Sequence, residues 1–145
     1  MIVKKIKILI VDDHPVVQEG LQGIIQQDPL FEVVGLCDKG KEVLPKIRDT
    51  LADIVILDIS LPDISGLEVL RMAQLAKLPV FFVVLTMYKE DEFISAATRL
   101  NARGFLFKDN TPAELLKCLH AVSKGENYYS ADVSAQLITH IQQVE

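Results

Sequence analysis

The chain has 145 residues, a length that allows one domain with a buried core but not two ordinary domains. Half of the residues are hydrophobic and 24% are charged, which excludes an intrinsically disordered chain. The net charge of −5 argues against nonspecific binding of nucleic acid, and no run reaches the ~18 apolar residues that a membrane span requires.

The two cysteines, Cys37 and Cys118, stand far apart in the sequence and lack the spacing of a metal site. We expect both to be buried free thiols in a reducing compartment. The N-terminus is basic and then apolar, but its apolar run is short and no small-residue cleavage site follows, so it does not fit a signal peptide. These features predict a cytoplasmic protein.

Strand-like and helix-like segments alternate along the chain. Runs rich in apolar and β-branched residues predict five strands, Ile6 to Val11, Phe31 to Leu36, Ile54 to Leu57, Val80 to Leu85 and Gly104 to Phe107. Apolar residues at helical spacing predict five helices, Val16 to Ile25, Val43 to Ile47, Leu67 to Leu75, Glu90 to Asn101 and Thr111 to about Lys124. Five such units imply a doubly wound α/β fold with a parallel sheet.

The last predicted helix has the clearest boundary signals. Thr111 is expected to be its N-cap, because Pro112 and Glu114 follow at the first and third helical positions. Gly125 is expected to end the helix.

Polar residues stand where four of the predicted strands end. Asp12 and Asp13 follow the first strand and Asp58 follows the third, while Thr86 and Lys108 follow the fourth and fifth. The carboxyl ends of parallel strands share one edge of the sheet, so these residues converge. Three carboxylates repel one another unless a cation joins them, and Mg²⁺ prefers oxygen ligands. The set predicts transfer of a phosphoryl group to Asp58.

The same segments carry a family resemblance. The DD pair at 12–13, LDISLPDISGLEVL at 57–70, LTMY at 85–88 and GFLFKD at 104–109 stand in order at matching spacing. They resemble the response-regulator receiver domain of two-component signalling, and specifically its NarL/FixJ (LuxR-like) subfamily, from Lys5 to about Ser130. The resemblance implies a flavodoxin-like (βα)5 fold with strand order 2-1-3-4-5. It also implies a signalling phosphoacceptor rather than an enzyme.

The resemblance assigns the acidic residues. Asp58 would accept a phosphoryl group from a sensor histidine kinase and would also lose it by self-dephosphorylation. Asp13 would bind Mg²⁺ directly and Asp12 would assist through water, with Asp58 and the backbone carbonyl of Ser60 as further ligands. Asp12 and Asp13 have a competing use as caps of the first helix. His14 is expected to be a solvated neighbour of the site rather than a ligand.

The resemblance also implies that Thr86 and Lys108 contact the phosphoryl group and that Thr86 and Phe105 form a conformational switch. Each has an ordinary alternative: a strand-end hydroxyl for Thr86, a solvated surface lysine for Lys108 and core packing for Phe105. Two departures from the family pattern are visible. Asp109 follows Lys108 where many receivers have proline, and Met87 stands where a small residue is common.

The domain prediction places the receiver at 1–124 and a linker helix at 125–145. In the linker, Val133, Leu137, Ile138 and Ile141 form an apolar stripe at helical spacing. It would lead to a helix-turn-helix output domain that is not present in this chain. DNA binding and control of transcription would belong to that domain, and phosphorylation could also drive formation of a homodimer.

Two other functional classes compete with this interpretation. A haloacid-dehalogenase-like phosphatase also forms an aspartyl phosphate, but its nucleophile lies on the first strand with a second Asp two residues later. Here Asp58 lies on the third strand and position 60 is Ser60. A degenerate receiver that binds partners without phosphorylation is the second class, and the intact set of site residues argues against it.

Overall fold

The computed structural model describes residues 4–87 and 91–130. Their strands form one parallel sheet in the order β2-β1-β3-β4-β5-β6. The strands are β1 Ile6–Val11, β2 Phe31–Cys37, β3 Ile54–Asp58, β4 Phe81–Thr86, β5 Gly104–Phe107 and β6 Tyr128–Tyr129. The α-helices are α1 Pro15–Ile25, α2 Val43–Thr50, α3 Gly66–Leu75, α4 Asp91–Arg99 and α5 Thr111–Ser123, with short 3-10 turns at Gly40–Glu42 and Lys108–Asn110.

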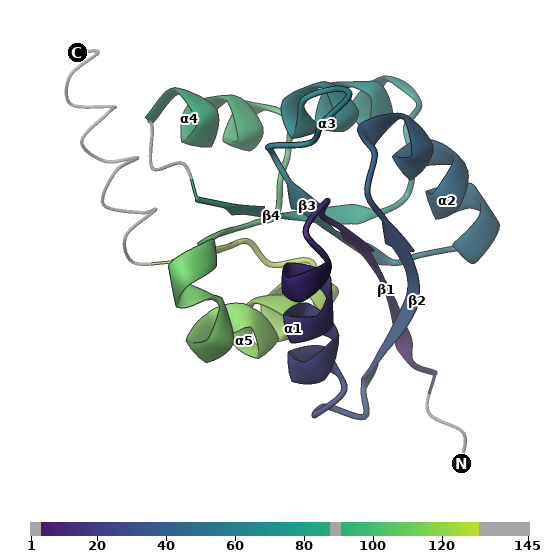
Figure 1. Ribbon diagram of the computed structural model, residues 1–145, viewed down its shortest axis with the longest axis vertical. Helices are drawn as coiled ribbons and strands as arrows, with labels where there is room; N and C mark the ends of the chain where they lie inside the picture. Colours follow the sequence, from purple (N-terminus) through teal and green to yellow (C-terminus); the bar gives the residue numbers. More distant parts are fainter. Residues whose placement is uncertain (1–3, 88–90, 131–145) are drawn as a thin grey trace.

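Helices cover both faces of the sheet, with α1 and α5 on one face and α2, α3 and α4 on the other (Figure 1). Two buried apolar clusters fill the two layers between helices and sheet. β3 lies in the middle and all five of its residues are buried, as its continuous apolar sequence predicts. The doubly wound fold and the strand order 2-1-3-4-5 are therefore confirmed.

Two features differ from the sequence predictions. Tyr128 and Tyr129 form a sixth strand beside β5. A strand of two residues has too short a sequence pattern to be predicted. Thr111 is already helical, and its hydroxyl donates to the carbonyl of Phe107 at 3.3 Å. The 3-10 turn before α5 moves Thr111 inside the helical segment, so the predicted N-cap role is wrong. Gly125, with φ +81°, ends the helix as predicted.

Among the described residues, no helix has the length and apolar character that crossing a membrane would require. The predicted linker helix falls mostly on 131–145, outside the described residues.

Hydrogen bonds to α3 and to the segment after β2 hold the loop that follows β3. Ser65 caps α3 by accepting a hydrogen bond from the N–H of Leu67 at 3.1 Å. The Asp63 carboxylate accepts bonds from the N–H groups of Lys41 and Gly40, at 2.9 and 2.7 Å, which lower its pKa to about 2. This loop is therefore tied to the segment after β2.

Gly66 provides a test of how closely this loop packs against β3. A Cβ atom there would lie 2.7 Å from the carbonyl oxygen of Asp58 and 2.8 Å from the Cα of Ile59. We expect Gly66→Ala to lower the free energy of unfolding by about 1–3 kcal/mol, because backbone atoms must shift. Urea unfolding of the variant measures the loss.

The matched control is Gly23→Ala in α1, where an added Cβ would meet nothing within 4 Å. This change should raise stability by about 0.5–1 kcal/mol through helix propensity. Equal effects of the two substitutions would contradict the close approach at Gly66.

Candidate functional site

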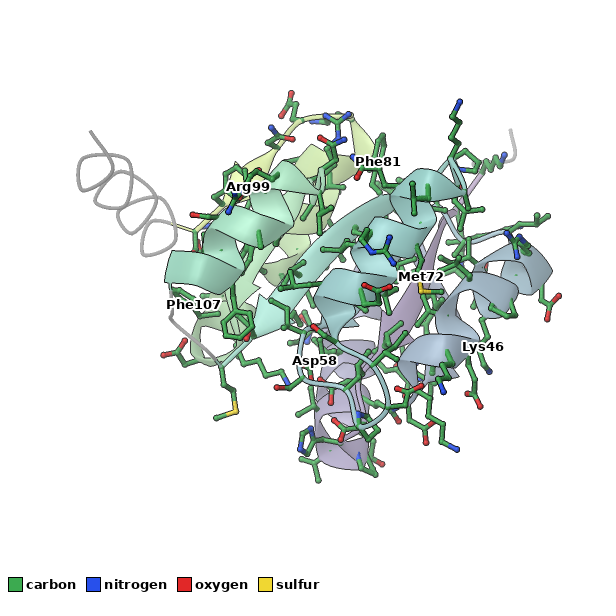
Figure 2. The ribbon with its side chains drawn as sticks, turned by 90° about the horizontal axis from the view of Figure 1, so that it is seen from above. Lys46, Asp58, Met72, Phe81, Arg99 and Phe107 are labelled. Atoms are coloured by element: carbon green, nitrogen blue, oxygen red, sulfur yellow. The ribbon has the colours of Figure 1, made fainter. Side chains whose placement is uncertain are left out.

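The five residues predicted from the sequence to form a site lie at the carboxyl edge of the sheet. Asp12 and Asp13 follow β1, Asp58 ends β3, Thr86 ends β4 and Lys108 follows β5. Figure 2 shows Asp58 at this edge, with Phe81 at the opposite end of the strands. The parallel topology brings residues together that lie up to 96 positions apart, from 12 to 108.

The ammonium group of Lys108 joins two of the carboxylates. Its Nζ lies 2.8 Å from Asp12 Oδ2 and 3.1 Å from Asp58 Oδ2, and both carboxylate side chains are 2% exposed. Lys108 itself is 13% exposed, so it is not a solvated surface lysine. Burial lowers the pKa of Lys108, but contacts with Asp12 and Asp58 outweigh that effect and the pKa is raised overall. Lys108 therefore stays charged.

The central carboxylate, Asp58, is held at both oxygens. Oδ1 accepts a hydrogen bond from the N–H of Ser60 at 3.0 Å, and Oδ2 accepts one from Lys108 Nζ at 3.1 Å. Burial raises the pKa of Asp58, and the nearby Asp12 adds to the rise, although Ser60 and Lys108 oppose it. Burial is the larger effect, so the pKa lies above its ordinary value.

Two acidic oxygens at this edge lack a good hydrogen bond within the described residues. Asp12 Oδ2 and Asp13 Oδ1 are buried; Lys108 Nζ lies 2.8 Å from the first, and His14 Nδ1 lies 3.1 Å from the second. Ligand atoms of Asp12, Asp13, His14 and Asp58 all lie within 4.8 Å of one another. Buried acidic oxygens so arranged fit a hard divalent cation such as Mg²⁺.

A pocket of about 400 Å³ opens beside Asp58, and its lining residues are His14, Asp58, Ser60, Met87 and Lys108. A phosphoryl group can therefore approach the carboxylate. Met87 is 73% exposed and forms part of the wall, so it narrows the entrance without closing it.

The proposed switch residues lie on one face of neighbouring strands. Thr86 pairs with Phe107 and Val84 pairs with Phe105 in the register of β4 and β5. Thr86 and Phe105 are both fully buried, and the rings of Phe105 and Phe107 meet edge to face at 6.3 Å. Phe105 thus packs in the core and also lies within two register positions of Thr86.

The structure adds residues that sequence reasoning missed. The N–H of His14 donates to Asp12 Oδ1 at 2.9 Å, its ring nitrogen lies 3.1 Å from the same oxygen, and Gln18 donates to the Asp12 carbonyl at 2.6 Å. The spacing of Gln18, one turn beyond His14 in α1, was the available signal. The Lys108–Asp109 peptide bond is trans, since the described residues contain no cis bond.

A family model for the response regulator receiver domain matches residues 8–120 of the chain. The chain belongs to this family. The receiver is similar to the response regulator GacA of Pseudomonas syringae pv. syringae (strain B728a), with 33% identity over 132 residues, 91% of this chain and 62% of GacA. The response regulator UvrY of Escherichia coli (strain K12) is 30% identical over 132 residues, 91% of this chain and 61% of UvrY. The receiver spans less than two thirds of these relatives.

Solved structures agree with this assignment. A LuxR-family two-component response regulator from Aurantimonas sp. SI85-9A1 superposes with a TM-score of 0.89 and 30% identity, over 98% of this chain and all of that one. The isolated receiver domain of RcsB from Salmonella enterica serovar Typhimurium gives a TM-score of 0.86 and 26% identity, over 92% and 99%. The predicted family and LuxR-like subfamily are confirmed, and this chain is a receiver domain of a two-component response regulator.

The raised pKa of Asp58 makes the stability of the receiver depend on pH. At pH values between the ordinary 3.8 and the raised folded value, the folded state binds more protons than the unfolded state. The free energy of unfolding therefore rises as the pH falls through this window. Above the window Asp58 is ionised in both states, and the full cost of burying its charge lowers the stability of the folded state. In buffer without divalent metal, we expect Asp58→Asn to raise the free energy of unfolding at pH 7, with a gain that vanishes toward pH 3.8.

Urea unfolding between pH 3.8 and 7 measures this difference. Asp49→Asn, at an exposed position of α2, is the control and should give no such gain. A loss of stability in Asp58→Asn at pH 7 would show that the contact with Lys108 outweighs burial.

Proposed function

We propose that this receiver accepts a phosphoryl group on Asp58 from a sensor histidine kinase and switches conformation to control an output. The observation that carries the proposal is the contact of one ammonium, Lys108, with both Asp12 and Asp58, in a cluster of acidic side chains that also includes Asp13. Such a site holds a nucleophilic carboxylate and binds extra positive charge, which transfer of an anionic group requires.

The transfer step follows from the positions of the chain's own groups. A carboxylate oxygen of Asp58 attacks the phosphorus of a phosphohistidine, and the new P–O bond forms as the P–N bond breaks with its electron pair leaving on the imidazole nitrogen. The N–H of Ser60 and the ammonium of Lys108 orient the two Asp58 oxygens before attack. Lys108 then contacts the transferred group.

We propose that Asp12, Asp13 and Asp58, with the backbone carbonyl of Ser60, hold Mg²⁺. Bound there, the ion would neutralise charge that develops on the phosphoryl oxygens. Without it, the carboxylates of Asp12 and Asp13 stand close to the path of an incoming anion and repel it, which slows transfer. The later loss of the phosphoryl group would use the same residues: water attacks the phosphorus, the P–O bond to Asp58 breaks, and the carboxylate is restored as inorganic phosphate leaves.

The switch would run from Thr86 to Phe105. When the hydroxyl of Thr86 turns to hydrogen-bond a phosphoryl oxygen, the space beside Phe107 and Phe105 changes, because all three lie on one face of β4 and β5. A buried aromatic pair responds to such a change by repacking rather than by a small continuous shift.

The output belongs to the whole protein and is also proposed. The relatives GacA and UvrY are response regulators, and solved structures include two RcsB dimers bound to two parallel DNAs. By analogy, residues 1–124 would form the receiver and residues 125–145 would lead to a DNA-binding output domain that controls transcription. Phosphorylation would promote a homodimer. We place the reaction in the cytoplasm, where the buried thiols of Cys37 and Cys118 stay reduced.

Labelling with acetyl phosphate and Mg²⁺ tests the proposal. Intact-mass spectrometry should show one added phosphoryl group that hydroxylamine removes, because the product is an acyl phosphate. Asp58→Asn should abolish the label, since an amide oxygen is a much poorer nucleophile, and chelation of Mg²⁺ should prevent it in the unmodified chain.

Asp49→Asn, at an exposed position of α2 away from the site, is the control. It should keep the label. A label that resists hydroxylamine, or that persists in Asp58→Asn, would contradict the proposal. No label on a folded chain would favour a receiver that binds partners without phosphorylation.

A further inference from the structure

The sixth strand, β6, lies beside β5, and the residue that follows it, Ser130, hydrogen-bonds the carbonyl of Phe105. β6 pairs with β5 in parallel register, with Tyr128 opposite Gly104 and Tyr129 opposite Phe105. Two backbone bonds hold it: the N–H of Tyr128 donates to the carbonyl of Arg103 at 2.8 Å, and the N–H of Ser130 donates to that of Phe105 at 3.2 Å. A change in the backbone at Phe105 therefore acts directly on Ser130.

The side chain of Tyr129 reaches the switch face of the sheet. Directly opposite residues of paired strands point to the same face, so Tyr129 and Phe105 are neighbours there. Tyr129 packs against the buried cluster that contains Phe105 and Phe107, and its hydroxyl donates to the carbonyl of Ala102 at 3.2 Å. Repacking of Phe105 thus changes the support of Tyr129.

Tyr128 points to the other face and holds β6 to α5. Its hydroxyl donates to Glu114 Oε1 at 2.9 Å, and its ring packs against the cluster beneath α5. This contact does not involve the switch residues. β6 is consequently held at two places. Tyr128 is held by contacts that do not involve Phe105, whereas Tyr129 packs beside Phe105 and Ser130 hydrogen-bonds the Phe105 carbonyl.

We propose that Tyr129 and Ser130 form the output contact of this receiver: rearrangement of Phe105 breaks the Ser130–Phe105 hydrogen bond and so alters the chain beyond Ser130. The inference rests on the proposed function, because phosphorylation of Asp58 supplies the rearrangement. It adds a physical route from the sheet to the segment that follows, through a strand that hydrogen-bonds β5 and, through Tyr128, is anchored to α5.

The test is amide hydrogen exchange measured by NMR on the full 145-residue chain, with and without beryllofluoride and Mg²⁺ as the phosphate mimic. We expect the Ser130 amide to exchange about fivefold faster with the mimic, as expected for the loss of one backbone hydrogen bond. The Tyr128 amide should keep its rate, because it donates to the carbonyl of Arg103 rather than of Phe105, and the Tyr128 hydroxyl holds this residue to α5. The signals of residues 131–145 should shift in the same sample.

A pair of substitutions separates the hydrogen bond from the side chain. Ser130→Pro removes the N–H that donates to Phe105, whereas Ser130→Ala removes the hydroxyl and keeps the N–H. With the mimic, Ser130→Ala should retain the shifts at 131–145. Ser130→Pro should lose them while signals from α4 and from the Asp58 loop still respond.

The outcomes distinguish this inference from the function on which it rests. Absence of any response around Asp58 in the unmodified chain would remove the proposed function. A response at Asp58 and α4 with unchanged exchange at Ser130, or equal shifts at 131–145 in the two variants, would overturn the output contact alone. The exchange rate of Ser130 in the unmodified chain decides the question even if Ser130→Pro fails to fold.

Discussion

The contact of Lys108 with Asp12 and Asp58 is the interaction on which the site depends. It joins the carboxyl ends of β1, β3 and β5, and it places one positive charge among carboxylates that would otherwise repel one another. One ammonium does not balance Asp12, Asp13 and Asp58 together, and burial keeps the pKa of Asp58 raised. The site therefore retains an excess of negative charge, which is the physical basis of the proposal that it binds a divalent cation.

The fold serves this contact by fixing where each strand ends. β3 is buried along its whole length, so Asp58 stands at the boundary between core and solvent. The loop that follows packs tightly because Gly66 lies against the backbone of Asp58 and Ile59, and because Asp63 binds the segment after β2. A carboxylate on a loose loop would lose its orientation, whereas this one is held from both sides.

The sequence was sufficient to predict strands β1 to β5 and the residues of the acidic edge, because their runs of apolar and β-branched residues are distinctive and the ends of parallel strands must meet. Lys108 and Asp58 lie 50 positions apart, and topology alone placed them together. Three features escaped prediction. The 3-10 turn before Thr111 has no distinctive sequence, β6 is only two residues long, and the contacts of His14 and Asp63 depend on loop geometry that propensities do not encode.

The central claim is that the unbalanced charge of Asp12, Asp13 and Asp58 binds Mg²⁺. The most direct measurement is thermal unfolding of the chain as Mg²⁺ is added, since an ion that binds only the folded state raises the Tm with concentration. The account predicts a saturable rise in Tm for the unmodified chain and a much smaller rise for Asp13→Asn. Asp49→Asn should show the same rise as the unmodified chain. An equal rise in all three proteins, or no rise in any, would contradict it.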